Sequence, residues 1–197
     1  MISSNEMKVL EAKSNIPRLG LMENAGKSVY QAIKQRLDLK DKKILVVCYH
    51  GNNGGDGFLC ARYLCDEAET AVLFIGDERK LKKEAMINFK KIERNEKIQF
   101  LMEDEVDFDA YDIIIDAVLG VGIHGRLNSG ISAIIDDINN SKAYKVSVDI
   151  PTGLDPDTGI VADKCVNADL IVTFHDLKKG LEKFQDKVVV MDIGLPK

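Results

Sequence analysis

The sequence predicts an α/β protein with a Rossmann-like three-layer αβα architecture and a mostly parallel central sheet. Short, continuous apolar runs of strand length alternate with stretches of helical periodicity along the chain. Such runs are typical of strands covered on both faces, and their alternation with helices favours right-handed crossovers between parallel strands. The 197 residues, 45% of them hydrophobic and 30% charged, can bury one core, so we expect a single domain over residues 1–197.

Two helices are expected before the first strand. Ser3-x-x-Glu6 is a capping-box pattern that predicts a short helix to about Lys13. Pro17 can begin a second helix, to about Leu37, whose apolar residues recur at helical spacing. The predicted strands are 44–48, 71–75, 98–101, 113–115, 146–148, 170–174 and 188–191, and the predicted helices among them are 58–67, 81–94 and 131–139.

Composition limits the partners. The net charge of −5 and the sequence pI of about 5.3 disfavour binding to nucleic acid or to an anionic membrane, so local groups must hold any anionic ligand. The first residues lack the pattern of a signal peptide, and no apolar run approaches a membrane span, so we expect a cytoplasmic protein. The four cysteines show no metal-ligand spacing and are expected to be buried, reduced thiols.

The first predicted strand leads into residues 51–57, GNNGGDG, and then into a predicted helix. Glycines in such a turn permit positive φ angles, and successive N–H groups there can surround a phosphate. A simple tight turn is the alternative. Four glycines with two Asn and one Asp form a narrower pattern than the dinucleotide fingerprint GxGxxG, from which this segment differs.

Two carboxylates follow predicted strands. Asp116 comes directly after residues 113–115, and Asp149 directly after residues 146–148. Ligand crevices of open α/β sheets lie at the carboxyl ends of the strands, and a carboxylate there needs a partner or a bound cation. Capping of the following turn is the alternative for either residue alone. Together they predict a ligand site beside the glycine-rich segment.

These segments resemble a known family. Residues 51–57 are similar to the GNNGGDG motif of the NAD(P)H-hydrate epimerase family, also called the YjeF N-terminal domain. Residues 116–122, DAVLGVG, resemble its DALFGTG segment, and residues 148–154, VDIPTGL, resemble its VDIPSGL segment. Residues 168–180 follow its AD...TF...K.G pattern, and the resemblance extends from Met22 nearly to Gly194.

The resemblance implies an isomerase that interconverts the C6 epimers of hydrated NADH or NADPH in nicotinamide nucleotide repair. It also implies a potassium ion, a homodimer and a functional link to an ADP- or ATP-dependent dehydratase. Residues implied to contact the hydrated nucleotide are Asn52, Asn53, Gly54, Gly55, Asp56, Gly120, Val121, Gly122, Ile123, His124, Gly125, Arg126 and Asp149. Asn53, Asp116 and Thr152 are implied to ligate the potassium ion.

For catalysis we expect Asp149 to be the proton carrier and Lys178 to tune its charge or to orient the substrate. Lys178 lies a few residues beyond a predicted strand, where it could pair with a carboxylate, hold a phosphate or simply be an exposed loop lysine. His50, His124 and His175 form no visible triad, and His124 is the best placed of them.

The chain departs from the family pattern at Thr152, where Ser is usual, and at Lys179, where Pro is common. Thr152 retains the hydroxyl and adds a methyl group that could disturb the ion site. One rival function is a non-catalytic nucleotide-binding or dimerisation module, related to the domain of an mRNA-decapping enhancer. The retained Asp116, Asp149 and Lys178 favour the enzyme. A conventional nicotinamide-dependent dehydrogenase is disfavoured, because GxGxxG is missing.

Overall fold

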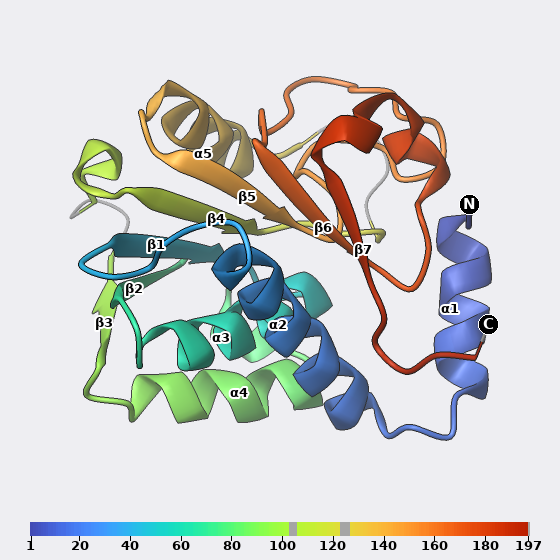
Figure 1. Cartoon of the computed structure of the whole chain (residues 1–197), viewed down its shortest axis with the longest axis horizontal. Coiled ribbons are helices and arrows are strands. Elements are labelled where there is room, and N and C mark those ends of the chain that lie inside the picture. Colours follow the sequence, from blue (N-terminus) through green and yellow to red (C-terminus); the bar gives the residue numbers. More distant parts are fainter. Residues whose placement is uncertain (103–105, 123–126, 197) are drawn as a thin grey trace.

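A computed structural model of the chain describes residues 1–102, 106–122 and 127–196. It contains a seven-stranded sheet in the order β3-β2-β1-β4-β5-β6-β7, and every neighbouring pair is parallel (Figure 1). The predicted sheet is confirmed. The strands are β1 (Lys43–Cys48), β2 (Glu69–Phe74), β3 (Ile98–Leu101), β4 (Ile113–Ala117), β5 (Tyr144–Val148), β6 (Leu170–Phe174) and β7 (Val188–Met191).

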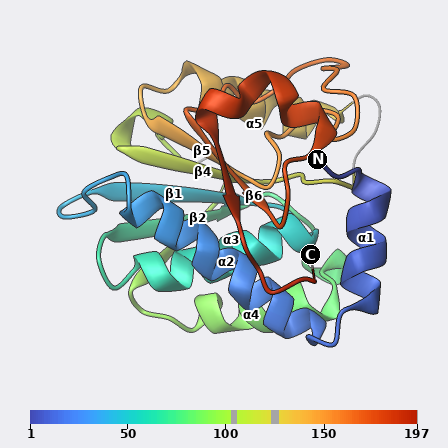
Figure 2. The same cartoon turned by 45° about the vertical axis from the view of Figure 1, so that its right-hand side comes forward.

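Helices cover both faces of this sheet, which gives the predicted three layers (Figures 1 and 2). On one face lie α2 (Arg18–Lys34), α3 (Asn52–Leu64) and α4 (Lys83–Glu93), where Val29, Phe58 and Phe89 join one buried apolar cluster. On the other face lie α5 (Ser129–Asn140) and the 3-10 segment η4 (Lys179–Lys187). Among the helices of the described residues, none is long and apolar enough to cross a membrane.

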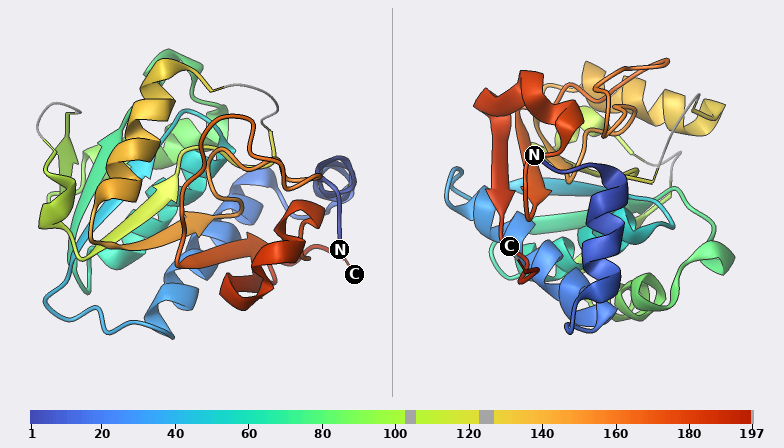
Figure 3. Two further views of the ribbon diagram at one scale, coloured as in Figure 1. Left: turned by 90° about the horizontal axis from the view of Figure 1, so that it is seen from above. Right: turned by 90° about the vertical axis from the view of Figure 1, so that its right-hand side faces the viewer.

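Helix α1 (Ser4–Lys13) lies outside these layers, across one edge of the sheet (Figure 3). The predicted capping box is present: the Ser3 side chain accepts from the backbone N–H of Glu6, and the Glu6 carboxylate accepts from the Ser3 N–H at 2.8 Å. The helix is attached to the body of the protein at its start. Ile2 forms a parallel bridge with Lys178, and Ser4 donates to the Asp157 carboxylate from both its N–H and its hydroxyl.

The glycine-rich segment corrects one prediction. Helix α3 begins at Asn52 with Gly51 as its N-cap, so most of the segment is helical and the helix does not start at Phe58. None of these glycines has a positive φ. They permit close packing instead: a Cβ on Gly54 would lie 1.8 Å from the Tyr49 carbonyl oxygen, and a Cβ on Gly57 would lie 2.5 Å from the Cβ of Ala117. Their absent side chains let α3 lie directly against β1 and β4.

The cysteines are free thiols, as predicted. Cys48 and Cys60 are buried, and burial raises the pKa of both thiols. Cys65 and Cys165 are only partly buried, so the expectation of four buried thiols is wrong for these two.

Candidate active site

Asp149 follows β5 in a tight turn. Its φ of 63° is in the left-handed region, and the Ile150 N–H donates to the Val148 carbonyl at 2.8 Å across it. A hydrogen bond spanning one residue with positive φ defines a strained form of γ-turn. Strain of this kind in a non-glycine residue is concentrated at functional sites, because the surrounding structure must maintain it. The turn therefore marks Asp149 independently of its sequence motif.

The Asp149 carboxylate forms a buried ion pair with Lys178. Lys178 Nζ lies 2.9 Å from Asp149 Oδ1 and also donates to the Phe174 carbonyl at 2.7 Å. The Thr173 hydroxyl donates to the same carboxylate oxygen at 3.1 Å. The side chain of Lys178 is 0% exposed and that of Asp149 11% exposed, so the pair is shielded from solvent and only the carboxylate reaches an open space. Of the three alternatives that the sequence left open for Lys178, the structure shows the pairing with a carboxylate.

The N-terminal segment helps to enclose Lys178. Ile2 bridges to Lys178, and the Lys179 N–H donates to the Ile2 carbonyl at 3.3 Å. Ile2 is itself buried, as part of the apolar cluster under α2. Because Lys178 is fully enclosed, it cannot hold a phosphate or act as an exposed loop lysine.

Asp116 lies within β4, one residue earlier than a strand-end position, and is fully buried. Its carboxylate accepts from the Ser147 hydroxyl at 2.8 Å and from the Thr152 N–H at 2.9 Å. The Thr152 hydroxyl donates to it at 2.5 Å and accepts from the Leu119 N–H at 3.0 Å. Burial raises the pKa of Asp116, and these hydrogen bonds oppose that rise. The network ties the ends of β4 and β5 together.

Asn53 adjoins this network with an unsatisfied amide. Its Nδ2 is fully enclosed and has no hydrogen-bond partner among the described residues, and its amide lies against Gly120. An amide can turn by 180° to place its oxygen at that position. No cationic side chain of the described residues pairs with the buried charge of Asp116. A buried carboxylate without a cationic partner and an amide group without a hydrogen-bond partner fit a hard cation.

A cavity of about 330 Å³ opens over this edge of the sheet, and we call it the Asp149 lobe. It lies where the strands end, as ligand crevices of parallel sheets do. Its lining residues come from α1, α3, the N-cap of α4 and the ends of β1, β4, β5 and β6: Met7, Lys8, Glu11, Tyr49, His50, Gly51, Asn52, Asn53, Asp56, Lys82, Val118, Leu119, Gly120, Val121, Gly122, Asp149 and Phe174.

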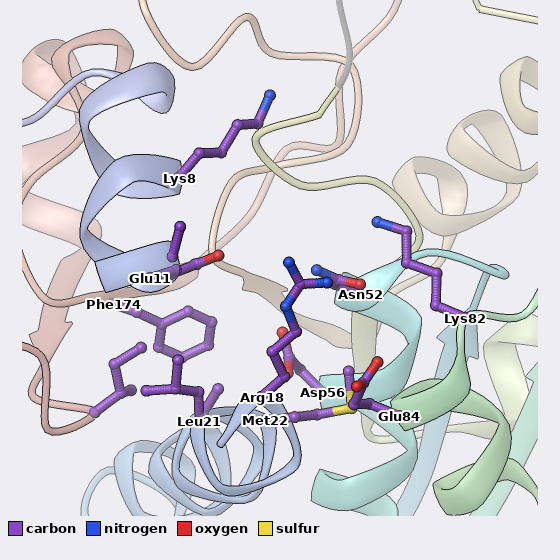
Figure 4. A pocket seen from close by; sticks show the side chains of 13 residues that line it. Lys8, Glu11, Arg18, Leu21, Met22, Asn52, Asp56, Lys82, Glu84 and Phe174 are labelled. Atoms are coloured by element: carbon purple, nitrogen blue, oxygen red, sulfur yellow. The ribbon is translucent and has the colours of Figure 1, made fainter. Parts of the chain in front are cut away.

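A second cavity of about 280 Å³, which we call the Arg18 lobe, adjoins the first. Pockets that bind small molecules commonly have volumes of roughly 300–1,000 Å³. The two lobes taken together fall within this range. Figure 4 shows three cations around the Arg18 lobe, Lys8 from α1, Arg18 at the start of α2 and Lys82 before α4. The two lobes share Lys8, Glu11, Asn52, Asp56, Lys82 and Phe174.

The structure brings many of the predicted site residues together. Those that line the Asp149 lobe are Asn52, Asn53, Asp56, Gly120, Val121, Gly122 and Asp149. Lys178, Asp116 and Thr152 are buried beneath it. Gly54 and Gly55 line neither lobe and pack against Tyr49 and Met22. Ile123, His124, Gly125 and Arg126 lie outside the described residues.

Several lining residues were not predicted. Tyr49 follows β1 and Phe174 ends β6, so the strand-end rule that located Asp149 would also have indicated these two. Met7 and Glu11 of α1 carry no sequence signal for a site, because only the tertiary fold places α1 across this edge. Of the histidines described, His50 lines the Asp149 lobe, and burial lowers its pKa.

The fold and the site define a Rossmann-like α/β protein with a small-molecule cavity and a buried acid–lysine pair at the carboxyl edge of its sheet. Comparison with known proteins agrees. The model of the YjeF-related protein N-terminus matches residues 18–180, and the chain belongs to this family.

Two relatives have nearly the same length as this chain. The NAD(P)H-hydrate epimerase of Oenococcus oeni is 38% identical over 93% of this chain and 89% of its own. That of Nitrosopumilus maritimus is 34% identical over 89% and 85%. The crystal structure of yeast ynu0, YNL200c, superimposes with a TM-score of 0.83 at 25% identity, over 98% of this chain and 87% of that chain.

Other relatives are longer. The bifunctional NAD(P)H-hydrate repair enzyme Nnr of Methanothermobacter thermautotrophicus is 38% identical over 92% of this chain, which spans 37% of its length. The corresponding enzyme of Archaeoglobus fulgidus is 40% identical, and the chain spans 42% of it.

Proposed function

We propose that this chain interconverts the two C6 epimers of hydrated NADH and NADPH, as an isomerase of nicotinamide nucleotide repair. The observation that carries the proposal is the ion pair of Asp149 and Lys178, enclosed beneath a ligand-sized cavity. The names of the relatives supply the substrate: proteins that match this chain over most of both lengths are NAD(P)H-hydrate epimerases.

The chemistry requires proton transfer at one hydroxyl group. The C6 carbon of the hydrated ring bears both the ring nitrogen and the hydroxyl, so inversion can proceed by loss and return of water or by ring opening and closure. Neither route breaks a C–H bond. A positioned carboxylate commonly contributes ~10²- to 10⁴-fold to such a step. Asp149 reaches the cavity and accepts or returns the proton, while Lys178 holds the carboxylate in place from behind.

The rest of the cleft suits a dinucleotide. The N-terminus of α3 at Asn52 faces both lobes, and helix N-termini favour anionic groups. Lys8, Arg18 and Lys82 supply positive charge around the Arg18 lobe, where the phosphates of the nucleotide would lie. These local cations answer the requirement set by the overall charge of −5, which by itself would repel an anionic ligand.

Asn53, Asp116 and Thr152 are the residues that would hold a potassium ion. The ion would supply a fixed positive charge that compensates the buried Asp116 and supports binding of an anionic nucleotide. The Thr152 hydroxyl donates to Asp116. The hydroxyl of the Ser that is usual in the family motif could make the same contact.

The test is to incubate the pure protein with the separated epimers and to follow their ratio by chromatography, without ADP, ATP or free nicotinamide cofactor. We expect the two epimers to reach one common ratio from either side. Unchanged ratios beside an active control enzyme would refute the proposed function.

Three further parts of the proposal concern partners and location. The longer bifunctional relatives support a functional link between this chain and an ADP- or ATP-dependent dehydratase of the same hydrates. The homodimer and the cytoplasmic location stay predictions from the family resemblance and the composition.

A further inference from the structure

Asp56 is a second carboxyl group of the cavity that the mechanism above does not use. It lies in α3, is 9% exposed and lines both lobes. In the described part of the chain, no hydrogen bond or ion pair involves its carboxyl group. Among the described residues, Asn53 Nδ2 is the only fully enclosed polar side-chain atom that has no hydrogen-bond partner. The Asp56 oxygens also have no partner, so they cannot be fully enclosed and must be open to the cavity that Asp56 lines.

The two carboxyl groups are in opposite electrostatic situations. Asp149 has a cation 2.9 Å away, whereas Asp56 has none and is buried beside other acids. Burial raises the pKa of Asp56 well above its usual value, and the charges of Asp149 and Glu11 raise it further. Two acids whose surroundings separate their proton affinities are the arrangement by which enzymes divide acid and base roles.

We propose that Asp56 is the second proton carrier of the epimerisation, acting together with Asp149. This inference rests on the proposed function. Epimerisation needs both roles in every turnover, because one proton must be given and another taken at the oxygen or the nitrogen bonded to C6.

In the route through water loss, the Asp56 carboxyl protonates the C6 hydroxyl. The C–O bond breaks, water leaves with the bonding pair, and the lone pair of the ring nitrogen forms a C=N⁺ bond. Water then adds to the opposite face of C6 and gives its extra proton to Asp149. The proton has moved from Asp56 to Asp149, and either proton exchange with solvent through the cavity or a reverse epimerisation restores both groups. In the ring-opening route, Asp149 takes the hydroxyl proton, C6 becomes a carbonyl carbon, and Asp56 protonates the ring nitrogen as the C–N bond breaks. Ring closure on the opposite face of the carbonyl reverses both proton transfers.

The surroundings of Asp56 are compatible with a role as proton carrier. No three His, Cys, Asp or Glu side chains converge as metal ligands do in the described residues, so Asp56 does not belong to such a cluster. The charged or titratable groups that face it or line its lobes are Lys8, Glu11, Arg18, Cys48, Tyr49, His50, Cys60, Lys82, Glu84 and Asp149. The cations among these lie around the cavity and form no ion pair with Asp56 among the described residues.

The deciding variant is Asp56→Asn. An amide imitates the shape and hydrogen bonding of a protonated carboxyl but carries no exchangeable acid proton. We expect kcat to fall ~10²-fold or more, with KM within about threefold of wild type. Asp66→Asn is the matched control, because it replaces an exposed carboxylate just beyond the other end of α3 that lines neither lobe. Its kcat should equal that of wild type.

Two outcomes separate this inference from the proposed function. If the wild-type protein fails to equilibrate the epimers, the function is wrong and the inference falls with it. If wild type is active and Asp56→Asn keeps its kcat within about threefold, the function stands and the inference is overturned.

The pH dependence of folding tests protonation without any substrate. A carboxyl whose pKa is higher in the folded than in the unfolded protein releases its proton on unfolding, so stability declines as pH rises above the ordinary value of about 3.9. The Tm of wild type should therefore fall more steeply between about pH 5 and about pH 8 than that of Asp56→Asn. Parallel Tm profiles would show that Asp56 is already ionised and would overturn the inference.

Discussion

The double-mutant cycle of Asp149→Asn and Lys178→Met tests the buried pair most directly. Lys178 is fully enclosed and Asp149 nearly so, and their charges lie 2.9 Å apart. Lys178→Met leaves the Asp149 carboxylate with the Thr173 hydroxyl as its remaining donor and leaves the Phe174 carbonyl without the ammonium group. Removing one partner of a buried ion pair lowers stability by about 3–5 kcal/mol, because the other charge stays buried without compensation.

For a chain of this size, each kcal/mol lowers Tm by about 2–4 °C, so Lys178→Met should lose roughly 6–20 °C. Asp149→Asn should lose less, because the amide oxygen can still accept from Lys178. The double variant buries no charge at this position. We expect its loss of stability to be smaller than the sum of the single losses by about 1–3 kcal/mol.

Turnover separates the catalytic from the structural contribution. Asp149→Asn should lower kcat ~10²-fold or more in protein that is folded at the assay temperature, with a smaller change in binding. The assay combines denaturant unfolding with epimer turnover on the same preparation. Stability losses that add within about 0.5 kcal/mol would show that the two charges act independently. Near-normal turnover of folded Asp149→Asn would remove Asp149 from the mechanism.

Four further predictions concern the packing of α3, the cleft, the ion and the oligomeric state. Gly54→Ala should lower the free energy of unfolding by about 3 kcal/mol or more, since its Cβ would meet a carbonyl oxygen at 1.8 Å, whereas Gly51→Ala, with nothing within 4 Å, should change it by less than about 1 kcal/mol; equal losses in urea melts would contradict the packing role. Arg18→Met should raise KM about tenfold with kcat within about twofold in steady-state kinetics, and an unchanged KM would remove Arg18 from phosphate binding. Asp116→Ala should reduce the free energy of nucleotide binding by more than it reduces the free energy of unfolding. Wild type should bind the nucleotide more tightly in potassium buffer than in sodium buffer, and identical calorimetric titrations in the two salts would refute the ion hypothesis. Solution scattering should give the mass of a homodimer, and a monomer mass at the working concentration would refute it.

The strands could be predicted closely because the physical signal is local. The predicted bounds of β3, β6 and β7 match the structure. The central strand β6 is buried at every position, as expected for a continuously apolar strand covered on both faces, whereas the edge strands β3 and β7 are partly exposed. The start of α3 could not be predicted in the same way. Glycine is a poor helix former, and only the close approach of α3 to Tyr49 and Ala117 explains why glycines occupy its first turns. That approach is a tertiary contact and leaves no trace in local propensity.

The candidate site shows the same division. The strand-end rule located Asp149, and the family motif added Lys178, but neither predicted that Lys178 is completely enclosed. Its enclosure depends on Ile2, at the opposite end of the chain, which bridges to it. A sequence pattern can place a lysine after a strand, whereas its charge state and role depend on what covers it.

Helix α1 shows that part of the candidate site lies outside the family motifs. The matched family region begins at residue 18, yet α1 precedes it and contributes Met7, Lys8 and Glu11 to the wall of the Asp149 lobe. Burial of Glu11 raises its pKa, and so does the charge of Asp149, so the α1 carboxyl interacts electrostatically with the buried pair of Asp149 and Lys178. The strand ends therefore make only one side of the cavity. The other side is formed by α1, whose sequence predicts its capping box but not its position in the fold. The electrostatics of the site therefore depend in part on residues that lie outside every motif of the chain.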